Sequence, residues 1–138
     1  MPMPRSPHVA LFVHAADQRF EDALILLENQ RTTGAVYVAG YGVECILKAM
    51  VVAAHPFRKQ VEAIRTFRGT KAHEFEWLRD QYLRRTGIQF PIEIVRHFAH
   101  VNTWRTDMRY RPGTLKFRDA KLFMESAQEI IQWSKERL

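Results

Sequence analysis

Cysteine is nearly absent from the sequence, because Cys45 is the only one among 138 residues. A single cysteine excludes an intrachain disulfide framework and a zinc site built from several cysteines. The first residues, MPMPRSPHVALFV, also lack a long apolar run and a small-residue cleavage pattern, so no signal peptide is expected. A reducing cytoplasm is therefore the expected location.

Several chemical motifs are missing as well. The chain contains no phosphate-binding GxxxxGKS/T or GxGxxG, no HExxH and no GxSxG. His97 and His100 are three residues apart, but Glu93 is the only carboxylate that adds to them, and His73 with its acidic neighbours is equally incomplete. Because zinc needs three or four converging ligands, neither a metal site nor a cofactor is expected.

An uncharged membrane-spanning run is also missing. The stretch AVYVAGYGVECILKAMV, residues 35–51, is long enough to cross a bilayer, but it carries Glu44 and Lys48 near its centre. Each of these charges costs roughly 2.5–3.5 kcal/mol on insertion scales. The sequence offers no second span, so we interpret the stretch as a buried helix and expect no membrane partner.

The apolar residues that are present recur with the period of a helix, and no segment alternates as a strand does. Ser6-Pro7 predicts the start of a helix that ends near Asn29, and Thr32 or Thr33 is the expected N-cap of the next. Three further helices are expected. The first is short and has Phe57, Val61, Ile64 and Phe67 on one face. The second contains Phe75, Leu78 and Tyr82 and ends at Gly87, and the third begins at Pro91. A loop, TWRTDMRYRPG, precedes a last helix that runs to the C-terminus. The prediction is one all-α domain over residues 1–138, an up-and-down bundle of four to six helices.

The second of these helices is apolar nearly all round, which is typical of the central helix of a bundle. It carries a line of small residues, namely Ala35, Ala39, Gly42 and Ala49. Glycine in a helix costs roughly 1 kcal/mol relative to alanine. We expect close approach of a neighbouring helix to compensate for that cost.

Positive charge is in excess, with 21 Lys and Arg against 15 Asp and Glu, a net charge of +6. This excess favours an anionic partner such as RNA, although many small proteins are basic without one. The first basic set is Arg58, Lys59, Arg65, Arg68 and Lys71, followed by Arg79, Arg84 and Arg85; the second is Arg105, Arg109 and Arg111. The second set is interleaved with Trp104 and Tyr110, whose rings can stack on bases. The alternatives are a solvated helix face for the first set and a packed loop for the second.

Three segments resemble the HEPN family (higher eukaryotes and prokaryotes nucleotide-binding domain). The second helix is similar to the family's Gly/Ala-Tyr-x-Val-Glu-x-x-Leu-Lys pattern, here Gly40, Tyr41, Val43, Glu44, Leu47 and Lys48. KAHEFEWLRD is similar to a His-x-Leu-x-x-Leu segment, with Phe75 in place of the first Leu. WRTDMRYRPG looks like the Trp and Arg-Tyr element that one branch of the family carries before its last helix.

The resemblance implies an all-α bundle, often a homodimer, and frequently one member of a toxin–antitoxin or defence pair with a nucleotidyltransferase-type partner. Many members are metal-independent ribonucleases with an Arg-x(4–6)-His motif at a composite dimer site. The nearest candidate here is RHFAH, where three residues separate Arg96 from His100. No histidine follows Arg105 or Arg109.

Glu44 and Lys48 lie on one helix face in the favourable order for an ion pair. One interpretation is a structural pair in which Lys48 reaches solvent along its aliphatic stem. Our hypothesis is that Glu44 is a buried anchor for the loop before the last helix, with Arg109 as a bidentate partner. Tyr110 is the third residue of this expected polar anchor.

Arg96 and His100 share a helix face one turn apart and are the candidate catalytic residues, with Arg109 as a phosphate ligand. Histidine can transfer protons near neutral pH, and arginine can stabilise the charge of a phosphorane. The alternative is that His97 and His100 are ordinary polar residues beside a core stripe. Cys45 is expected to be an inert core residue rather than a nucleophile.

Three classes of function remain open at this point. The first is an RNA-directed protein of a toxin–antitoxin or defence pair that acts as a metal-independent ribonuclease. The second is a non-catalytic module that binds a nucleotide or a partner protein. The third is a plain helical dimerisation subunit.

Overall fold

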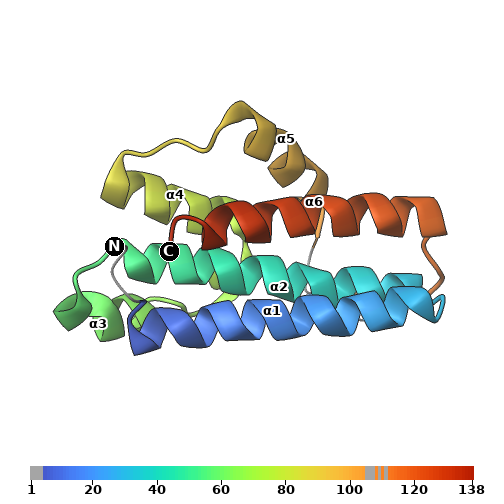
Figure 1. The fold of residues 1–138 in the computed structure, drawn as a ribbon, viewed down its shortest axis with the longest axis horizontal. Coiled ribbons are helices and arrows are strands. Elements are labelled where there is room, and N and C mark those ends of the chain that lie inside the picture. The colour runs from blue at the N-terminus through green and yellow to red at the C-terminus, as the bar shows by residue number, and fades with distance from the viewer. Residues whose placement is uncertain (1–4, 105–107, 109, 111) are drawn as a thin grey trace.

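The computed structural model covers residues 1–138 and describes residues 5–104, 108, 110 and 112–138. Every regular element within these residues is helical, as Figure 1 shows. The elements are α1 (Pro7–Glu28), α2 (Thr32–Ala53), η1 (Phe57–Lys59), α3 (Gln60–Arg65), η2 (Thr70–His73), α4 (Phe75–Thr86), α5 (Ile92–Val101) and α6 (Phe117–Lys135). The prediction of an all-α bundle is confirmed.

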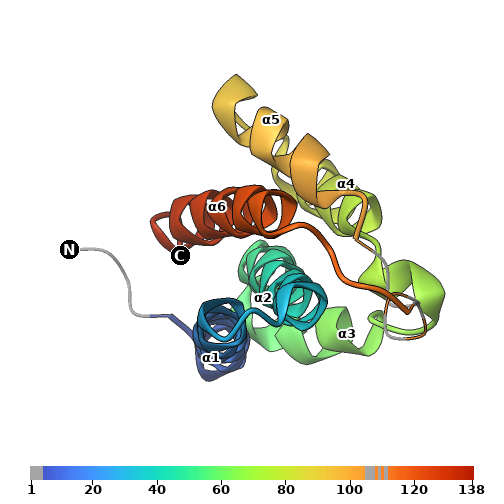
Figure 2. The same ribbon diagram turned by 90° about the vertical axis from the view of Figure 1, so that its right-hand side faces the viewer.

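The long helix α2 lies between α1 on one side and α6 and α4 on the other (Figure 2). Its small residues are buried, and a Cβ at Gly42 would lie 3.3 Å from the carbonyl oxygen of Ala16 in α1. The predicted close approach of a neighbouring helix is therefore confirmed. By length and composition α2 could span a membrane, with a mean hydropathy of 1.6, and 72% of that stretch is buried inside the protein.

The start of α1 follows the sequence prediction, but the start of α2 does not. The Ser6 side chain accepts a hydrogen bond from the Val9 amide, so Ser6 is the N-cap of α1. The prediction of Thr32 or Thr33 as the next N-cap is wrong. Thr32 Oγ1 donates to the Leu115 carbonyl at 2.7 Å, and Thr33 Oγ1 lies 3.2 Å from the Gly113 carbonyl. The two threonines instead attach the segment before α6 to the α1–α2 turn.

The predicted face of the short third helix is confirmed only in part, because Ile64 and Phe67 pack partly buried against the core while its other two residues do not. Phe57 and Val61 are 62% and 43% exposed, whereas Gln60 and Ala63 are buried. Gln60 is buried without cost to its amide, because Nε2 donates to the His55 carbonyl at 3.1 Å and Oε1 accepts from Ser6 at 2.6 Å. Apolar periodicity could not reveal this, since the residue that faces the bundle is polar.

Helices α4 and α5 form the outer layer beside α6 (Figure 1). Gly87 closes α4 in the left-handed conformation with φ 69°, as its position predicts. The loop that follows α5 contains Arg105, Arg109 and Arg111, which lie outside the described residues. Its far end is anchored through Gly113 and Leu115 to the threonines of α2.

Candidate functional site

Trp104 stands where the loop leaves α5, and it is packed rather than free to stack on a base. Its side chain is 5% exposed, and its Nε1 donates to the Tyr37 carbonyl at 3.1 Å. The indole stacks on Phe75 with centroids 5.3 Å apart and meets Tyr41 edge-on at 5.0 Å. The packed-loop alternative is confirmed for this residue.

Gly40 makes the position of Trp104 sterically feasible. A Cβ at Gly40 would lie 2.0 Å from Nε1 of the indole, a distance that no side chain can occupy. The Trp104 ring therefore lies directly against Gly40 of the central helix, and Tyr41 also packs against that ring. This part of the family-like pattern serves packing.

Glu44 lies one turn further along α2 and is buried with two partners. Its Oε2 is 3.0 Å from the Lys48 ammonium, and its Oε1 is 2.8 Å from Nδ1 of His73. Lys48 is only 12% exposed, and its Nζ lies 5.3 Å from the centroid of the Phe67 ring. The interpretation that Lys48 reaches into solvent is wrong. The predicted partner Arg109 lies outside the described residues, and Tyr110 is 74% exposed.

The contact between Glu44 and His73 is a carboxylate–imidazole dyad. A carboxylate oxygen can only accept, so Nδ1 of the ring carries the proton and donates it. In the neutral ring the lone pair then belongs to Nε2, on the opposite edge. The carboxylate is buried and takes Nδ1, so Nε2 is on the ring edge away from it, and the imidazole side chain as a whole is 43% exposed. This is the geometry of an oriented general base.

Charges of both signs flank His73 in the chain, because exposed Glu74 and Glu76 follow it and exposed cations precede it. Arg65, Arg68 and Lys71 precede His73 in the same short segment, and all three are exposed. Arg58 and Lys59 are exposed on η1. We use the name basic face for these five exposed residues of the segment 58–71, which also contains the exposed Glu62. Lys71 is also positioned by Trp77, with its Nζ 5.6 Å from the centroid of the indole.

Two other arginines from the predicted first set are engaged elsewhere. The Arg79 guanidinium lies 4.7 Å from the Phe98 ring, and its Nε is buried. The Nε of Arg85 donates to the Ala54 carbonyl at 3.4 Å. Arg79 is therefore a packing residue and not part of a surface that tracks phosphates.

A second histidine site lies between α5 and α6. Nδ1 of His97 and Nδ1 of His100 are 3.0 Å and 3.2 Å from the same hydroxyl oxygen, that of Ser126, which is buried. A hydroxyl has one proton, so at most one ring accepts it and the other must donate its own Nδ1–H. Arg96 is exposed on the adjacent part of α5. Ser126 thus fixes both rings through their Nδ1 atoms.

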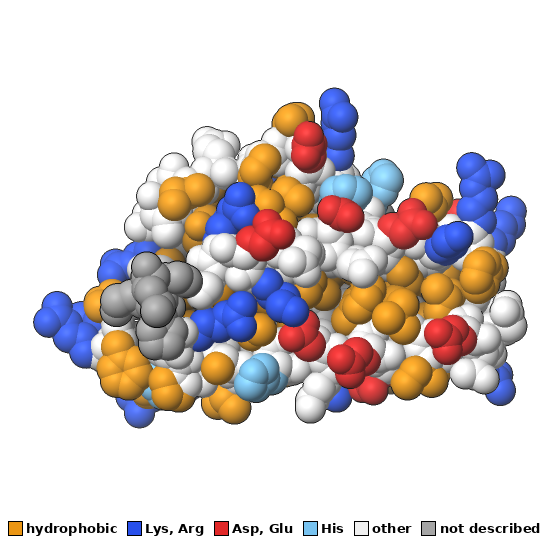
Figure 3. Space-filling model, viewed as in Figure 1, with side chains coloured by type: hydrophobic (Ala, Val, Ile, Leu, Met, Phe, Trp, Pro, Cys, Tyr) orange, Lys and Arg blue, Asp and Glu red, His pale blue; other side chains and the backbone are white. Residues whose placement is uncertain are grey.

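Carboxylates surround this second site. Glu93 lies one turn before His97 on α5, and Glu125 and Glu129 flank Ser126 on α6; all three are exposed. Figure 3 shows acidic side chains next to the histidines over the α5–α6 surface. Such a surrounding repels a phosphate backbone. Within the described part of the chain, no group of three or more His, Cys, Asp or Glu side chains is placed to hold a metal ion.

Cys45 follows Glu44 in α2, and burial raises the pKa of its thiol from 9.0 to about 11, with the Glu44 charge as a second cause. Only the thiolate is alkylated, and two pKa units reduce its fraction at pH 8 about a hundredfold. We expect iodoacetamide to modify native Cys45 about a hundredfold more slowly than Cys45 of the urea-unfolded chain, as mass spectrometry over time would show. Equal rates would contradict an inert core thiol.

The comparisons with known proteins agree with this architecture. The family model of the HEPN domain matches residues 9–138. The chain belongs to the HEPN domain family. No curated protein and no solved structure matches it. Membership places the HEPN chain in a family of nucleotide-binding or ribonuclease-like domains.

Sequence reasoning missed the role of His73 and of Ser126 in this HEPN domain. His73 was available as part of the family-like KAHEF segment, but nothing local links it to Glu44, 29 residues earlier. Nothing in the sequence around Ser126 indicates that it contacts histidines, because a serine on an apolar helix face usually forms a hydrogen bond with its own backbone. Both roles arise only from tertiary packing.

Proposed function

We propose that this HEPN domain acts on RNA at the basic face and cleaves it without a metal ion, with His73 as the proton-transfer group. The observation that carries the proposal is the buried Glu44 carboxylate holding Nδ1 of a half-exposed imidazole at 2.8 Å. Arg65, Arg68 and Lys71 precede His73 in the chain and offer the charge that a phosphate backbone needs, while Glu74 and Glu76 follow it.

RNA cleavage at this site needs only proton transfer and charge stabilisation, and residues of the chain can supply both. Nε2 of His73 takes the proton of a ribose 2′-hydroxyl, and the 2′ oxygen attacks the adjacent phosphorus. The bond from phosphorus to the 5′ oxygen breaks, which leaves a 2′,3′-cyclic phosphate. The imidazolium, stabilised by Glu44, then gives the proton to the departing 5′ oxygen. Exposed cations of the basic face stabilise the charge on the phosphorane.

Arg96 and His100, with Arg109 as phosphate ligand, form the competing centre. Its support is the ordered pair of imidazoles on Ser126, and its weakness is the acidic surrounding. A symmetric dimer would bring two copies of this centre together. The same proposal includes a homodimer in the cytoplasm and a nucleotidyltransferase-type partner in a toxin–antitoxin or defence pair, which the family resemblance supports.

One assay distinguishes the two centres. Labelled tRNA and a mixed RNA ladder are incubated in EDTA with the wild type, His73→Ala and His100→Ala. We expect His73→Ala to lose at least about a hundredfold in rate, the usual contribution of a general base, and His100→Ala to stay near wild type. Added imidazole should restore part of the His73→Ala activity, which a purely structural role would not allow.

Circular dichroism of each variant provides the folding control. Loss of cleavage in His100→Ala and Arg96→Ala but not in His73→Ala would move the reaction to the α5–α6 site. If the wild type does not cleave, gel shifts with the same RNA test the non-catalytic module. In that case Arg65→Gln and Arg68→Gln should weaken RNA binding and reduce its salt dependence.

A further inference from the structure

Lys48 joins Glu44 and His73 in a group of three ionisable side chains, which we call the carboxylate cluster. The Lys48 ammonium is 3.0 Å from Oε2 of Glu44, and Nδ1 of His73 is 2.8 Å from Oε1, so each carboxylate oxygen has its own partner. The exposed fraction is 6% for Glu44, 12% for Lys48 and 43% for His73. Because Lys48 is nearly buried, it can influence a reaction at the surface only through Glu44 and His73.

An aromatic ring covers one side of the Lys48 ammonium. The centroid of the Phe67 ring is 5.3 Å from Nζ, and Phe67 is itself packed edge-on against Phe12 and Trp77. Water screens a pair of charges at the surface, whereas a pair beneath apolar rings keeps more of its interaction. The positive charge of Lys48 therefore acts strongly on the other groups of the carboxylate cluster.

The two cationic side chains compete for one negative charge. Protonation of His73 at Nε2 makes the ring an imidazolium, which the neighbouring Glu44 carboxylate favours. The Lys48 ammonium opposes the same step, because it repels a second positive charge and already neutralises the carboxylate. Lys48 thus lowers the affinity of the ring for a proton.

We propose that Lys48 is a positioning residue, which sets the charge of the Glu44–His73 dyad and favours the neutral imidazole. A general base acts only in its unprotonated form, and a buried carboxylate without Lys48 would hold more of the rings as imidazolium. The inference rests on the proposed function because it concerns the same dyad, but its test measures the ring and not cleavage.

The charged residues next to the dyad in the chain are exposed, so water screens their effect on the ring. They are Arg65 and Arg68 at and after the end of α3, Lys71 on η2, Glu74 between η2 and α4, and Glu76 in the first turn of α4. All of them stay in place when Lys48 or Glu44 is replaced. Differences among such variants therefore report on the carboxylate cluster.

Titration of the histidine signals by NMR, on the full chain without RNA, tests the proposal. The chain has six histidines, and the His73 signal is assigned by its loss in His73→Ala. We expect the pH midpoint of this signal to be about one unit higher in Lys48→Met than in the wild type, a shift typical of losing one nearby charge. Glu44→Gln should move the midpoint to lower pH, since the ring then loses its carboxylate and keeps the cation.

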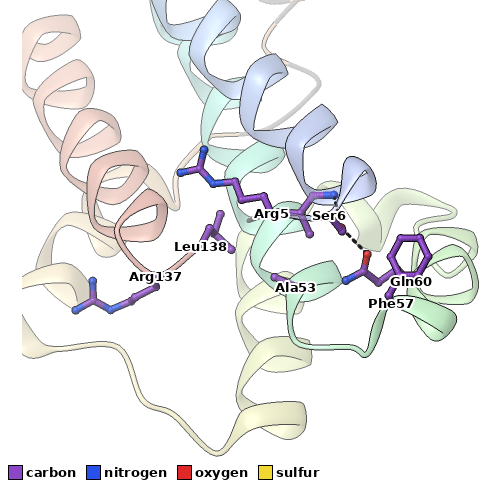
Figure 4. A pocket seen from close by; sticks show the side chains of 8 residues that line it. Arg5, Ser6, Ala53, Phe57, Gln60, Arg137 and Leu138 are labelled. Atoms are coloured by element: carbon purple, nitrogen blue, oxygen red, sulfur yellow. Dashed lines mark hydrogen bonds between the residues drawn. The ribbon is translucent and has the colours of Figure 1, made fainter. Parts of the chain in front are cut away.

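Two further variants provide the controls. Lys48→Arg keeps the positive charge and should keep the midpoint close to that of the wild type. Arg5→Gln removes a positive charge elsewhere and should leave the midpoint unchanged. Arg5 lines the pocket in Figure 4, where the start of α1 meets the end of the chain, and none of the residues that line this pocket belongs to the carboxylate cluster.

Circular dichroism shows whether each variant is folded. Lys48→Gln is also neutral, and its amide can still donate to Glu44, so it replaces Lys48→Met if that variant does not fold. Equal midpoints in the neutral variant and the wild type would overturn the proposal and leave Lys48 as one half of a structural ion pair.

The pH profile of RNA cleavage provides a second measurement. If the wild type cleaves, the acid limb of kcat/KM should move to higher pH in Lys48→Met by the same amount as the midpoint, and an unmoved limb would contradict the proposal. If the wild type does not cleave, the midpoints still decide whether Lys48 sets the charge of the dyad. Failure of the ribonuclease proposal and failure of this inference are therefore distinguishable.

Discussion

Gly40→Ala is expected to destabilise the domain by roughly 3–5 kcal/mol, the range for losing a buried aromatic side chain. The added methyl would occupy the position of the Trp104 indole, 2.0 Å from Nε1. Trp104 must then leave its site, which breaks the bond to the Tyr37 carbonyl and the stack on Phe75. Thermal unfolding should show a midpoint lower by about 10 °C or more.

Gly34→Ala is the matched control for this change. Gly34 is also in α2, but the nearest atom to its added Cβ is Leu26 Cδ1 at an ordinary 3.7 Å. Because alanine is the better helix former by roughly 1 kcal/mol, Gly34→Ala should be neutral or stabilising. Tryptophan fluorescence should shift to longer wavelength in Gly40→Ala alone. An unchanged spectrum with unchanged stability would show that Trp104 does not occupy this site.

The helices and the core could be predicted from sequence because both depend on local patterns. Ser6-Pro7 marks the start of α1, Gly87 ends α4, and apolar residues at three- and four-residue steps give the buried face of α6. The line of small residues in α2 predicted close helix packing for the same reason. A helix of six residues such as α3 has few positions from which to predict a face, and there the polar Gln60 is buried while the predicted Val61 is exposed.

The candidate site could not be predicted, because its bonds join residues far apart in the chain. The acidic and basic positions of Glu44 and Lys48 were visible in one helix, but His73 completes the cluster from another element. His97 and His100 were visible as a pair, while the serine that fixes their rings is on α6. Spacing within a helix shows which residues share a face. It does not show which distant side chain that face meets.

Glu44→Gln is expected to cost about 3–5 kcal/mol of stability, because it leaves the nearly buried Lys48 ammonium without its counter-charge. Urea denaturation of Glu44→Gln should show a lower midpoint. Asp17→Asn is the matched control, since the Asp17–Lys135 pair is partly exposed at 3.0 Å and should contribute about 1 kcal/mol or less.

A comparison of Glu44→Gln with a double variant separates the effect of the unpaired charge from a loss of packing. In Glu44→Gln/Lys48→Met the unpaired cation is gone, so the double variant should be more stable than Glu44→Gln alone. The His73 contact remains a hydrogen bond to the amide oxygen in both variants, which keeps η2 in place.

Unchanged thermal stability in Glu44→Gln would show that Glu44 is not a structural anchor. Its carboxylate would then matter only for the orientation and charge of His73. In that case Glu44→Gln should lower RNA cleavage while leaving the fold intact.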